Sequence, residues 1–138
     1  MTGVVLVDDD KEGRIAERRI LEAFHGLVPV VRTHAKSGDK ESSGHELEDL
    51  FDRAYYVDLV NASHLDVKGF EPLQPEALDS SMPMTDAVAK AFKDAKLGKF
   101  GKLRPAQEFY ARVEVGKAPL ATTRKRFASL FERLNREF

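Results

Sequence analysis

Two aspartates one residue apart, Asp8 and Asp10, directly follow a short aliphatic run at residues 4–7. Side chains alternate along a strand, so both carboxylates lie on one side of the backbone if strand geometry continues past the run. Carboxylate oxygens are the ligands that Mg²⁺ and Mn²⁺ prefer in proteins. The pair therefore predicts a divalent metal site, and the alternative is that the aspartates only cap the next helix, where carboxylates interact well with the helix dipole.

The elements predicted around this pair form a strand, a helix and a second strand. Residues 4–7 are typical of a buried strand in a parallel sheet, because they are aliphatic and end in polar residues. Ala16 and Ile20 then follow at helical spacing, and Gly26 is expected to end that helix before a second strand at residues 28–31. In such a unit, functional groups gather at the carboxyl ends of the strands, where the aspartate pair stands.

The rest of the chain is predicted to be almost entirely helical. A polar segment rich in glycine and serine, residues 33–46, indicates an exposed loop. Helical patterns follow at residues 46–51 (one turn), 54–60, 85–96 with Thr85 as the cap, 105–113 and 127–134, with irregular structure over 64–84. The predicted fold is a single α/β domain, 1–138, with a partial parallel sheet of few strands in portion 1–60 and a helical portion, 61–138.

Composition limits the class of protein. The chain has 138 residues and no cysteine, which excludes thiolate metal sites and disulfides. No apolar run approaches the roughly 18 residues of a membrane span, so a cytoplasmic protein without membrane contact is expected. The net charge of −1 divides unevenly: residues 1–89 hold 9 Lys and Arg against 18 Asp and Glu, and residues 90–138 hold 13 against 5. This division suits an acidic metal-binding half and a basic half that faces a polyanion, or two halves that attract each other.

The motif around the aspartates resembles a known family. The stretch VVLVDDDKEGRIAERRI is similar to the second half of a Toprim domain, with Asp8, Asp10 and Gly13 at the positions of its Asp-x-Asp and glycine. HELEDLFDRAYYVDLVN resembles the next segment in the OLD (overcoming lysogenization defect) family of ATPase-linked nucleases. GKLRPAQEFYARVE, around Lys102, and TTRKRFASLFERLNREF resemble that family's lysine segment and closing helix.

The resemblance implies a metal-dependent DNA endonuclease that hydrolyses phosphodiester bonds by a two-metal mechanism. Asp8 and Asp10 would hold Mg²⁺ or Mn²⁺, and Glu48 would belong to the acidic cluster or support it. Lys102, or Lys99 in its place, would stabilise negative charge on the cleaved phosphate. The alternatives are that Glu48 is an ordinary carboxylate at a helix start and that Lys102 is a surface lysine.

Two features of the family are missing from the sequence. Toprim domains use a glutamate from a strand and turn before the Asp-x-Asp strand, and only Met1, Thr2 and Gly3 precede it here. The phosphate-binding motif of ATPases is also absent. The expectation is therefore a catalytic portion that is incomplete and inactive alone. An ATPase domain or subunit would supply the rest, and an exposed sheet edge beside residues 4–7 would favour self-association.

Two other functions remain open. VVLVDDDKEGR also resembles the start of a response-regulator receiver, a Mg²⁺-binding signalling domain, but counting from Asp58 places its phosphate acceptor on Ser63, and using Asp66 needs a shift of register. A non-catalytic nucleic-acid binder would use the basic residues of the last helix to neutralise phosphates. Those residues are Arg124, Lys125 and Arg126, followed by Arg133 and Arg136.

The histidines lack the spacing of a metal site. His25, His34, His45 and His64 form no His-x-x-x-His pattern and no triad with a serine, so loop or surface positions are expected for all four.

Overall fold

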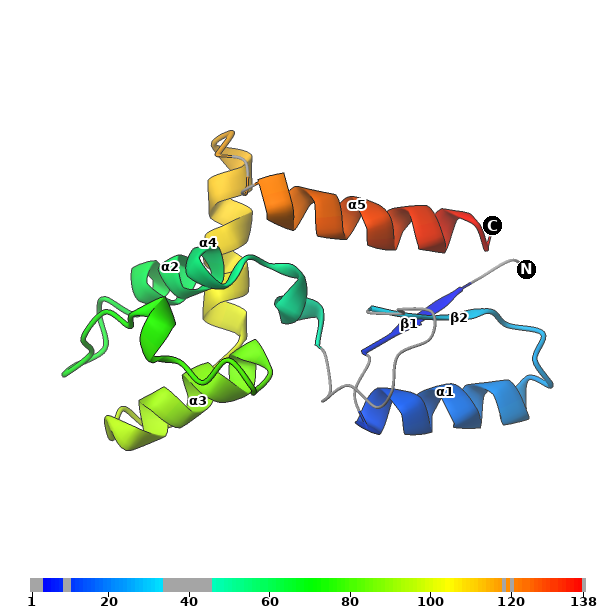
Figure 1. Cartoon of the computed structure of the whole chain (residues 1–138), viewed down its shortest axis with the longest axis horizontal. Coiled ribbons are helices and arrows are strands. Elements are labelled where there is room, and N and C mark those ends of the chain that lie inside the picture. The colour runs from blue at the N-terminus through cyan, green and yellow to red at the C-terminus, as the bar shows by residue number, and fades with distance from the viewer. Residues whose placement is uncertain (1–3, 9–10, 34–45, 118, 120, 138) are drawn as a thin grey trace. The chain divides into compact units, whose positions relative to one another are not determined.

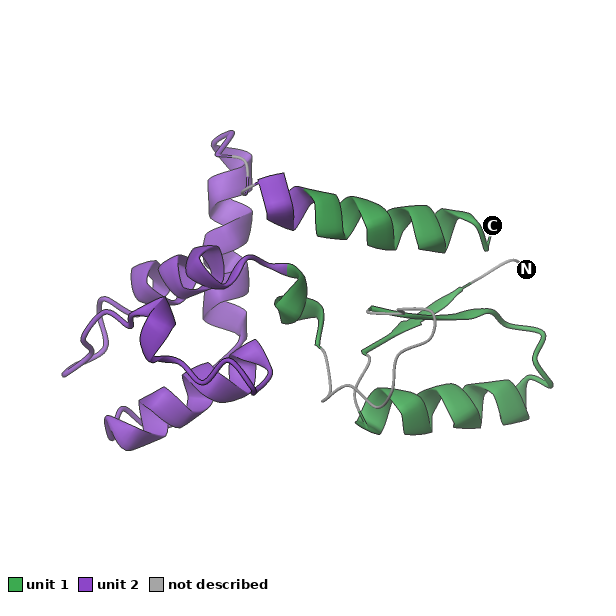
Figure 2. Ribbon diagram, in the orientation of Figure 1, with its two compact units in different colours: residues 1–50, 125–138 green, residues 51–124 purple. Residues whose placement is uncertain are grey.

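The computed structural model describes residues 4–8, 11–33, 46–117, 119 and 121–137. This part of the chain is mixed α/β and mostly helical, with five α-helices and one short parallel sheet near the N-terminus (Figure 1). The coarse prediction of an α/β start and a helical remainder is therefore confirmed. The chain divides into two compact units, residues 1–50 with 125–138 and residues 51–124 (Figure 2). The prediction that they form a single domain stays a prediction.

The first unit, residues 1–50 with 125–138, is built on a strand, a helix and a strand. Strand β1 (Val5–Val7) pairs in parallel with β2 (Val30–Arg32), and helix α1 (Lys11–Ala23) connects them. Both predicted strands and the predicted helix are thus confirmed. Helix α1 ends as predicted, because Gly26 has a φ of 72° and donates its N–H to the carbonyl of Leu21 at 2.9 Å. In the described residues the sheet has two strands, so β1 has no second neighbour there.

The two faces of this sheet carry different helices. Val31, the middle residue of β2, is buried together with Leu50 and with Leu130 of helix α5 (Ala121–Asn135). Its neighbour Arg32 points to the opposite face, since strand side chains alternate, and there it binds Glu17 of α1. Figure 2 shows α1 and the C-terminal part of α5 on opposite sides of the strands. The core of this unit therefore lies between the sheet, α5 and the short 3₁₀ helix η1 (Leu47–Leu50).

The second unit, residues 51–124, is helical. Helix α2 (Arg53–Ser63) packs against α4 (Leu103–Glu114), and α3 (Met84–Asp94) supplies the buried Val88 and Phe92. Asp52 caps α2 by accepting the N–H of Ala54 at 3.0 Å. The N–H of Asp52 in turn donates to the hydroxyl of Thr123, the third residue of α5, at 2.8 Å. This hydrogen bond joins the start of α5 to the start of α2.

The segment between α2 and α3 is more ordered than the irregular surface path expected from its sequence. The amide of Asn61 holds Leu73 through both the N–H and the carbonyl of its main chain, at 2.8 and 3.0 Å. A short 3₁₀ helix, η2 (Pro75–Ala77), follows, and Leu78 is buried. The predicted cap of the next helix is wrong: Pro83 is the residue before α3, and Thr85 lies inside the helix.

Candidate metal centre

Asp8 stands where the sequence places it, at the carboxyl end of β1. The carbonyl of Val7 accepts the N–H of Thr33 at 3.0 Å, so parallel pairing continues to the last residue before Asp8. The Asp8 carboxylate is half-buried, and its Oδ1 accepts the N–H of Leu47 at 3.1 Å. This hydrogen bond joins the carboxylate at the end of β1 to a segment that lies 39 residues further along the chain.

That segment is η1, which carries Glu48. Leu47 is the first residue of η1, so the half-buried Glu48 is the next residue after the one that donates to Asp8. Asp49 has a local role, since its Oδ2 accepts the N–H of Glu46 at 2.8 Å and so closes the turn. The fold therefore brings the acidic segment 46–49 to the strand end that bears Asp8, and Asp8 and Glu48 belong to the same unit.

The described residues supply only part of a metal site. Asp10, the second predicted ligand, lies outside the described residues, as does Asp9. Among the residues that are described, no group of three His, Asp or Glu is arranged to hold a metal ion. The donors that can be placed, Asp8 and Glu48, are carboxylates, and their oxygen atoms match the chemistry of Mg²⁺ and Mn²⁺.

Lys102 belongs to the other unit. It precedes α4 with helical backbone angles, and its side chain is exposed, as is that of Lys99. Two residues later, Arg104 binds both carboxylate oxygens of Asp66, at 2.7 and 2.8 Å. The hydrogen bond from Arg104 lowers the pKa of Asp66 below its ordinary value.

The three predicted nucleic-acid-binding residues do not share one side of α5. Arg124, Lys125 and Arg126 are all exposed on this helix. Consecutive residues are about 100° apart around a helix, so Lys125 and Arg126 share a side with residues 129, 133 and 136, whereas Arg124 lies beside residues 128 and 131. Any ligand bound by Lys125 and Arg126 is therefore turned away from Arg124.

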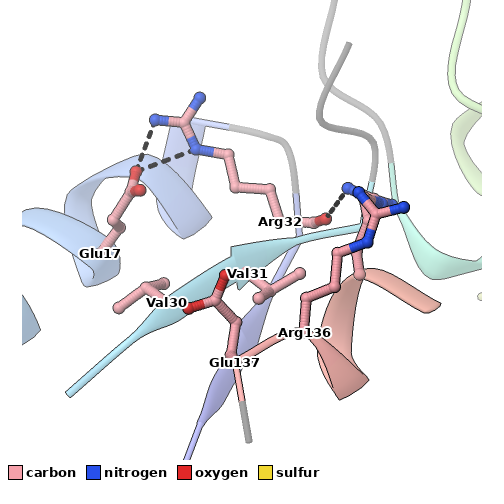
Figure 3. A pocket seen from close by; sticks show the side chains of 7 residues that line it. Glu17, Val30, Val31, Arg32, Arg136 and Glu137 are labelled. Carbon is pink, nitrogen blue, oxygen red and sulfur yellow. Dashed lines mark hydrogen bonds and ion pairs between the residues drawn. The ribbon is translucent and has the colours of Figure 1, made fainter. Parts of the chain in front are cut away.

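Arg133 has a structural contact that the sequence did not reveal. Its guanidinium donates to the carbonyls of Arg32 and Thr33, at 2.8 and 2.6 Å, and so ties α5 to the carboxyl end of β2. A shallow pocket of about 390 Å³ opens beside this contact, lined by Val30, Val31, Arg32 and Glu17 and by Arg133, Arg136 and Glu137 (Figure 3). The guanidinium of Arg133 thus stands at the same sheet edge as Asp8.

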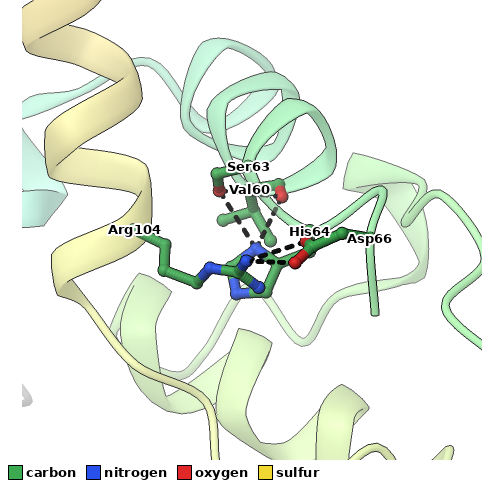
Figure 4. Close-up of polar contacts among 5 residues, drawn as sticks. All are labelled: Val60, Ser63, His64, Asp66 and Arg104. Atoms are coloured by element: carbon green, nitrogen blue, oxygen red, sulfur yellow. Dashed lines mark hydrogen bonds and ion pairs between the residues drawn. The ribbon is translucent and has the colours of Figure 1, made fainter. Parts of the chain in front are cut away.

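The prediction that His64 is a loop or surface residue is wrong. It is the residue that ends α2, and only 3% of its surface is exposed. Its ring contacts Phe70, Phe92 and Phe100, with centroids 5.0 to 5.8 Å away. Nδ1 lies 2.8 Å from the carbonyl of Val60 and 3.0 Å from the hydroxyl of Ser63 (Figure 4). His64 therefore fills an aromatic core and satisfies a helix end.

The segment that a receiver would use as its phosphorylated strand is helical. Asp58 lies on α2, is exposed, and accepts a hydrogen bond from Arg112 of α4 at 2.5 Å. Arg112 also binds Glu108 at 2.8 Å. Burial acts to lower the pKa of Arg112, but these two carboxylates outweigh burial and raise it. Ser63 and Asp66 follow at the end of this helix, so the geometry of a receiver site is absent from this described segment.

Comparisons with known proteins add no assignment. No protein-family model matches the chain, and no curated protein and no solved structure is significantly similar to it. A separate observation concerns membranes: none of the helices in the described part of the chain is both long and apolar enough to span one.

Proposed function

We propose that this chain is the metal-binding catalytic portion of a DNA endonuclease of the Toprim type, similar to the OLD nucleases. The observation that carries the proposal is the hydrogen bond between the Asp8 carboxylate and the N–H of Leu47. It joins the carboxyl end of a parallel strand, where ligands gather in α/β sheets, to the acidic segment that contains Glu48.

In this proposal Asp8, Asp10 and Glu48 supply oxygen ligands for Mg²⁺ or Mn²⁺. The bound metal would supply an activated water and charge neutralisation for phosphodiester hydrolysis. The protein's own contribution is positioning: the β1–β2 pairing fixes the main chain before Asp8, and the bond to Leu47 orients its carboxylate. Lys102 would stabilise charge on the cleaved phosphate. The same resemblance implies an ATPase domain or subunit as partner, together with self-association through the sheet edge beside β1.

The test is calorimetric titration with Mn²⁺ and with Mg²⁺. The proposal expects binding in the native chain and its loss in the Asp8→Ala, Asp10→Ala double variant. Asp86→Ala, Asp94→Ala is the matched control, because it removes two exposed carboxylates from α3. Equal binding by the native chain and the Asp8, Asp10 variant would overturn the metal site.

A plasmid-nicking assay with Mn²⁺ addresses catalysis separately. The chain is expected to be inactive alone, so the native chain should bind Mn²⁺ without nicking. Any nicking that it does show should stop when EDTA is added and should be absent from the Asp8→Ala, Asp10→Ala variant. Nicking that persists in this variant would contradict the catalytic role of the two aspartates, whatever the titration shows.

A further inference from the structure

Basic residues outnumber acidic ones along one side of α5 and of the turn that follows it, where the exposed Glu132 lies seven positions after Lys125 and four before Arg136. Positions 125, 126, 129 and 133 recur at intervals of three, four and seven, so their side chains line one side of the helix, and Arg136 follows in the turn after α5. Lys125, Arg126 and Arg136 are exposed and Arg133 is half-buried. We call these four residues the α5 basic stripe. The apolar residues of the helix lie on another side: Phe127, Leu130 and Leu134 pack toward Val31 and Leu50.

The stripe ends at the pocket beside β2. Arg133 and Arg136 belong to both the stripe and the pocket, and Val30 and Val31 of β2 contribute its apolar lining (Figure 3). Two of the guanidinium groups are held in place. That of Arg133 binds the carbonyls of Arg32 and Thr33. That of Arg32 binds the carboxylate of Glu17, at 2.5 and 2.9 Å. A fixed guanidinium loses little entropy when it binds an anion, which makes this end of the stripe suited to a phosphate group.

The stripe leads to the edge of the sheet that bears Asp8. Arg133 binds the carbonyl of Thr33, and Thr33 donates to the carbonyl of Val7, the residue before Asp8. Neighbouring strands are about 4.8 Å apart, so Arg133 and Asp8 stand beside adjacent strand ends. A strand of nucleic acid that follows the stripe would therefore pass the strand end that bears Asp8 where it meets Arg133.

We propose that the α5 basic stripe and its pocket bind the sugar-phosphate backbone of a nucleic acid strand and direct it toward Asp8. This inference rests on the proposed nuclease function and names its substrate-binding surface. Arg136 lies eleven positions after Lys125, which is about 16 Å along a helix. That length corresponds to about five base-pair steps of a duplex, whose axis rises roughly 3.4 Å for each phosphate of one strand.

The distribution of apolar residues favours nucleic acid over an anionic membrane. A helix that lies on a membrane presents an apolar face beside its basic one. On α5 the apolar side is occupied by its own core, since Leu130 is 1% exposed and packs with Val31. The charged residues that line the pocket also set the charge of a suitable ligand. The charges of Glu17 and Arg32 cancel in their ion pair, and Glu137 offsets one of the two remaining arginines, Arg133 and Arg136. The net charge of +1 matches one phosphate group of a nucleic acid backbone.

The test measures binding of a fluorescent 20-nucleotide DNA, single-stranded and duplex, by anisotropy in EDTA. Lys125→Gln, Arg136→Gln removes the two ends of the stripe. Arg124→Gln, Lys117→Gln removes the same charge from exposed positions that are not part of the stripe. All four residues are exposed, so the variants should fold, and circular dichroism checks that they do.

The stripe variant should bind DNA at least tenfold more weakly at 100 mM salt, and the slope of log K against log salt should fall by about two. The control variant should stay within twofold of the native chain. No DNA binding by the native chain, or equal loss in both variants, would overturn the proposal. Stripe-dependent binding to vesicles with 30% phosphatidylserine, without binding to DNA, would assign the surface to membranes instead.

EDTA removes divalent metal ions, so DNA binding measured in EDTA does not depend on the proposed metal site. The Asp8→Ala, Asp10→Ala variant should still bind DNA in EDTA. If Mn²⁺ binding fails while the stripe variant loses DNA, the nuclease proposal fails and the surface stands as a binding site. If Mn²⁺ binding holds while the stripe variant binds DNA normally, only the stripe is refuted.

Discussion

Asp8 and Leu47 are joined by a hydrogen bond of 3.1 Å between a side-chain oxygen and a main-chain N–H, although 39 residues separate them. Leu47 begins η1, so the carboxylate satisfies an N–H at the start of this short helix. Asp8 thus has a structural role that does not depend on a metal. Any substitution of Asp8 acts on this contact and on the proposed metal site together, and the two effects have to be separated.

Asp8→Asn and Asp8→Ala should separate them. Asparagine keeps an Oδ1 acceptor for the N–H of Leu47 but has no negative charge. In Asp8→Asn the hydrogen-exchange rate of the Leu47 amide should therefore stay close to that of the native chain, while Mn²⁺ binding should weaken. Alanine removes both, so Leu47 should also exchange faster. Hydrogen exchange followed by NMR measures the first effect and calorimetry the second. Asp49→Ala is the local control, because it should release the N–H of Glu46 and leave Leu47 protected.

Leu130 should be the most costly single truncation in the first unit. It is 1% exposed and lies in the cluster with Val31 and Leu50, so Leu130→Ala should lower the free energy of unfolding by about 2–5 kcal/mol. Phe131, the next residue, is 56% exposed and provides the control. Phe131→Ala should change stability by less than about 1 kcal/mol. Urea unfolding followed by circular dichroism measures both, and similar losses would contradict this core.

Much of the secondary structure follows from local patterns. The strands beside Asp8, helix α1 with its end near Gly26, and the four later helices were predicted from apolar spacing and capping residues. Thr85 was misread as a cap because its hydroxyl and its place before an apolar pattern are typical of one, yet it is buried inside α3. Pro83, with its fixed φ, takes the cap position instead.

Less of the candidate site was accessible from sequence, because it depends on contacts between distant segments. The position of Asp8 was predicted, and the resemblance named Glu48, but the bond from Asp8 to Leu47 joins residues on either side of a long polar segment. The carbonyls bound by Arg133 lie about 100 positions earlier. His64 lies where α2 ends, and its burial depends on Phe70, Phe92 and Phe100, which no local pattern brings together.

Thr123 should stabilise the second unit through its hydroxyl. It is fully buried and accepts the N–H of Asp52 at 2.8 Å. Thr123→Val keeps the shape of the side chain and leaves that N–H without its acceptor, so the free energy of unfolding should fall by about 1–3 kcal/mol. Thr122→Val changes an exposed neighbour and should stay within about 0.5 kcal/mol of native. Thermal unfolding of the two variants measures the difference, and equal stability would show that the hydrogen bond contributes nothing.

The pair formed by Arg104 and Asp66 should make stability depend on pH. The pKa of Asp66 is lowered from 3.8, first by its hydrogen bond with Arg104. A carboxyl whose pKa is lower in the folded chain stabilises it above the unfolded pKa, and this contribution is lost as the pH falls through the folded pKa. Arg104→Gln should therefore be less stable than native at pH 7, and the two should converge in acid.

An NMR titration of the Asp66 carboxyl tests the cause. Arg104→Gln should raise the pKa of Asp66 toward its ordinary value, and 1 M NaCl should raise it in the native chain, because salt screens exposed charges. Asp79 is the internal control: its pKa is lowered by the hydroxyl and N–H of Ser81, at 2.6 and 2.9 Å, and should not change in this variant. An unchanged Asp66 in Arg104→Gln would show that the lowered pKa comes from its own main chain and not from the guanidinium.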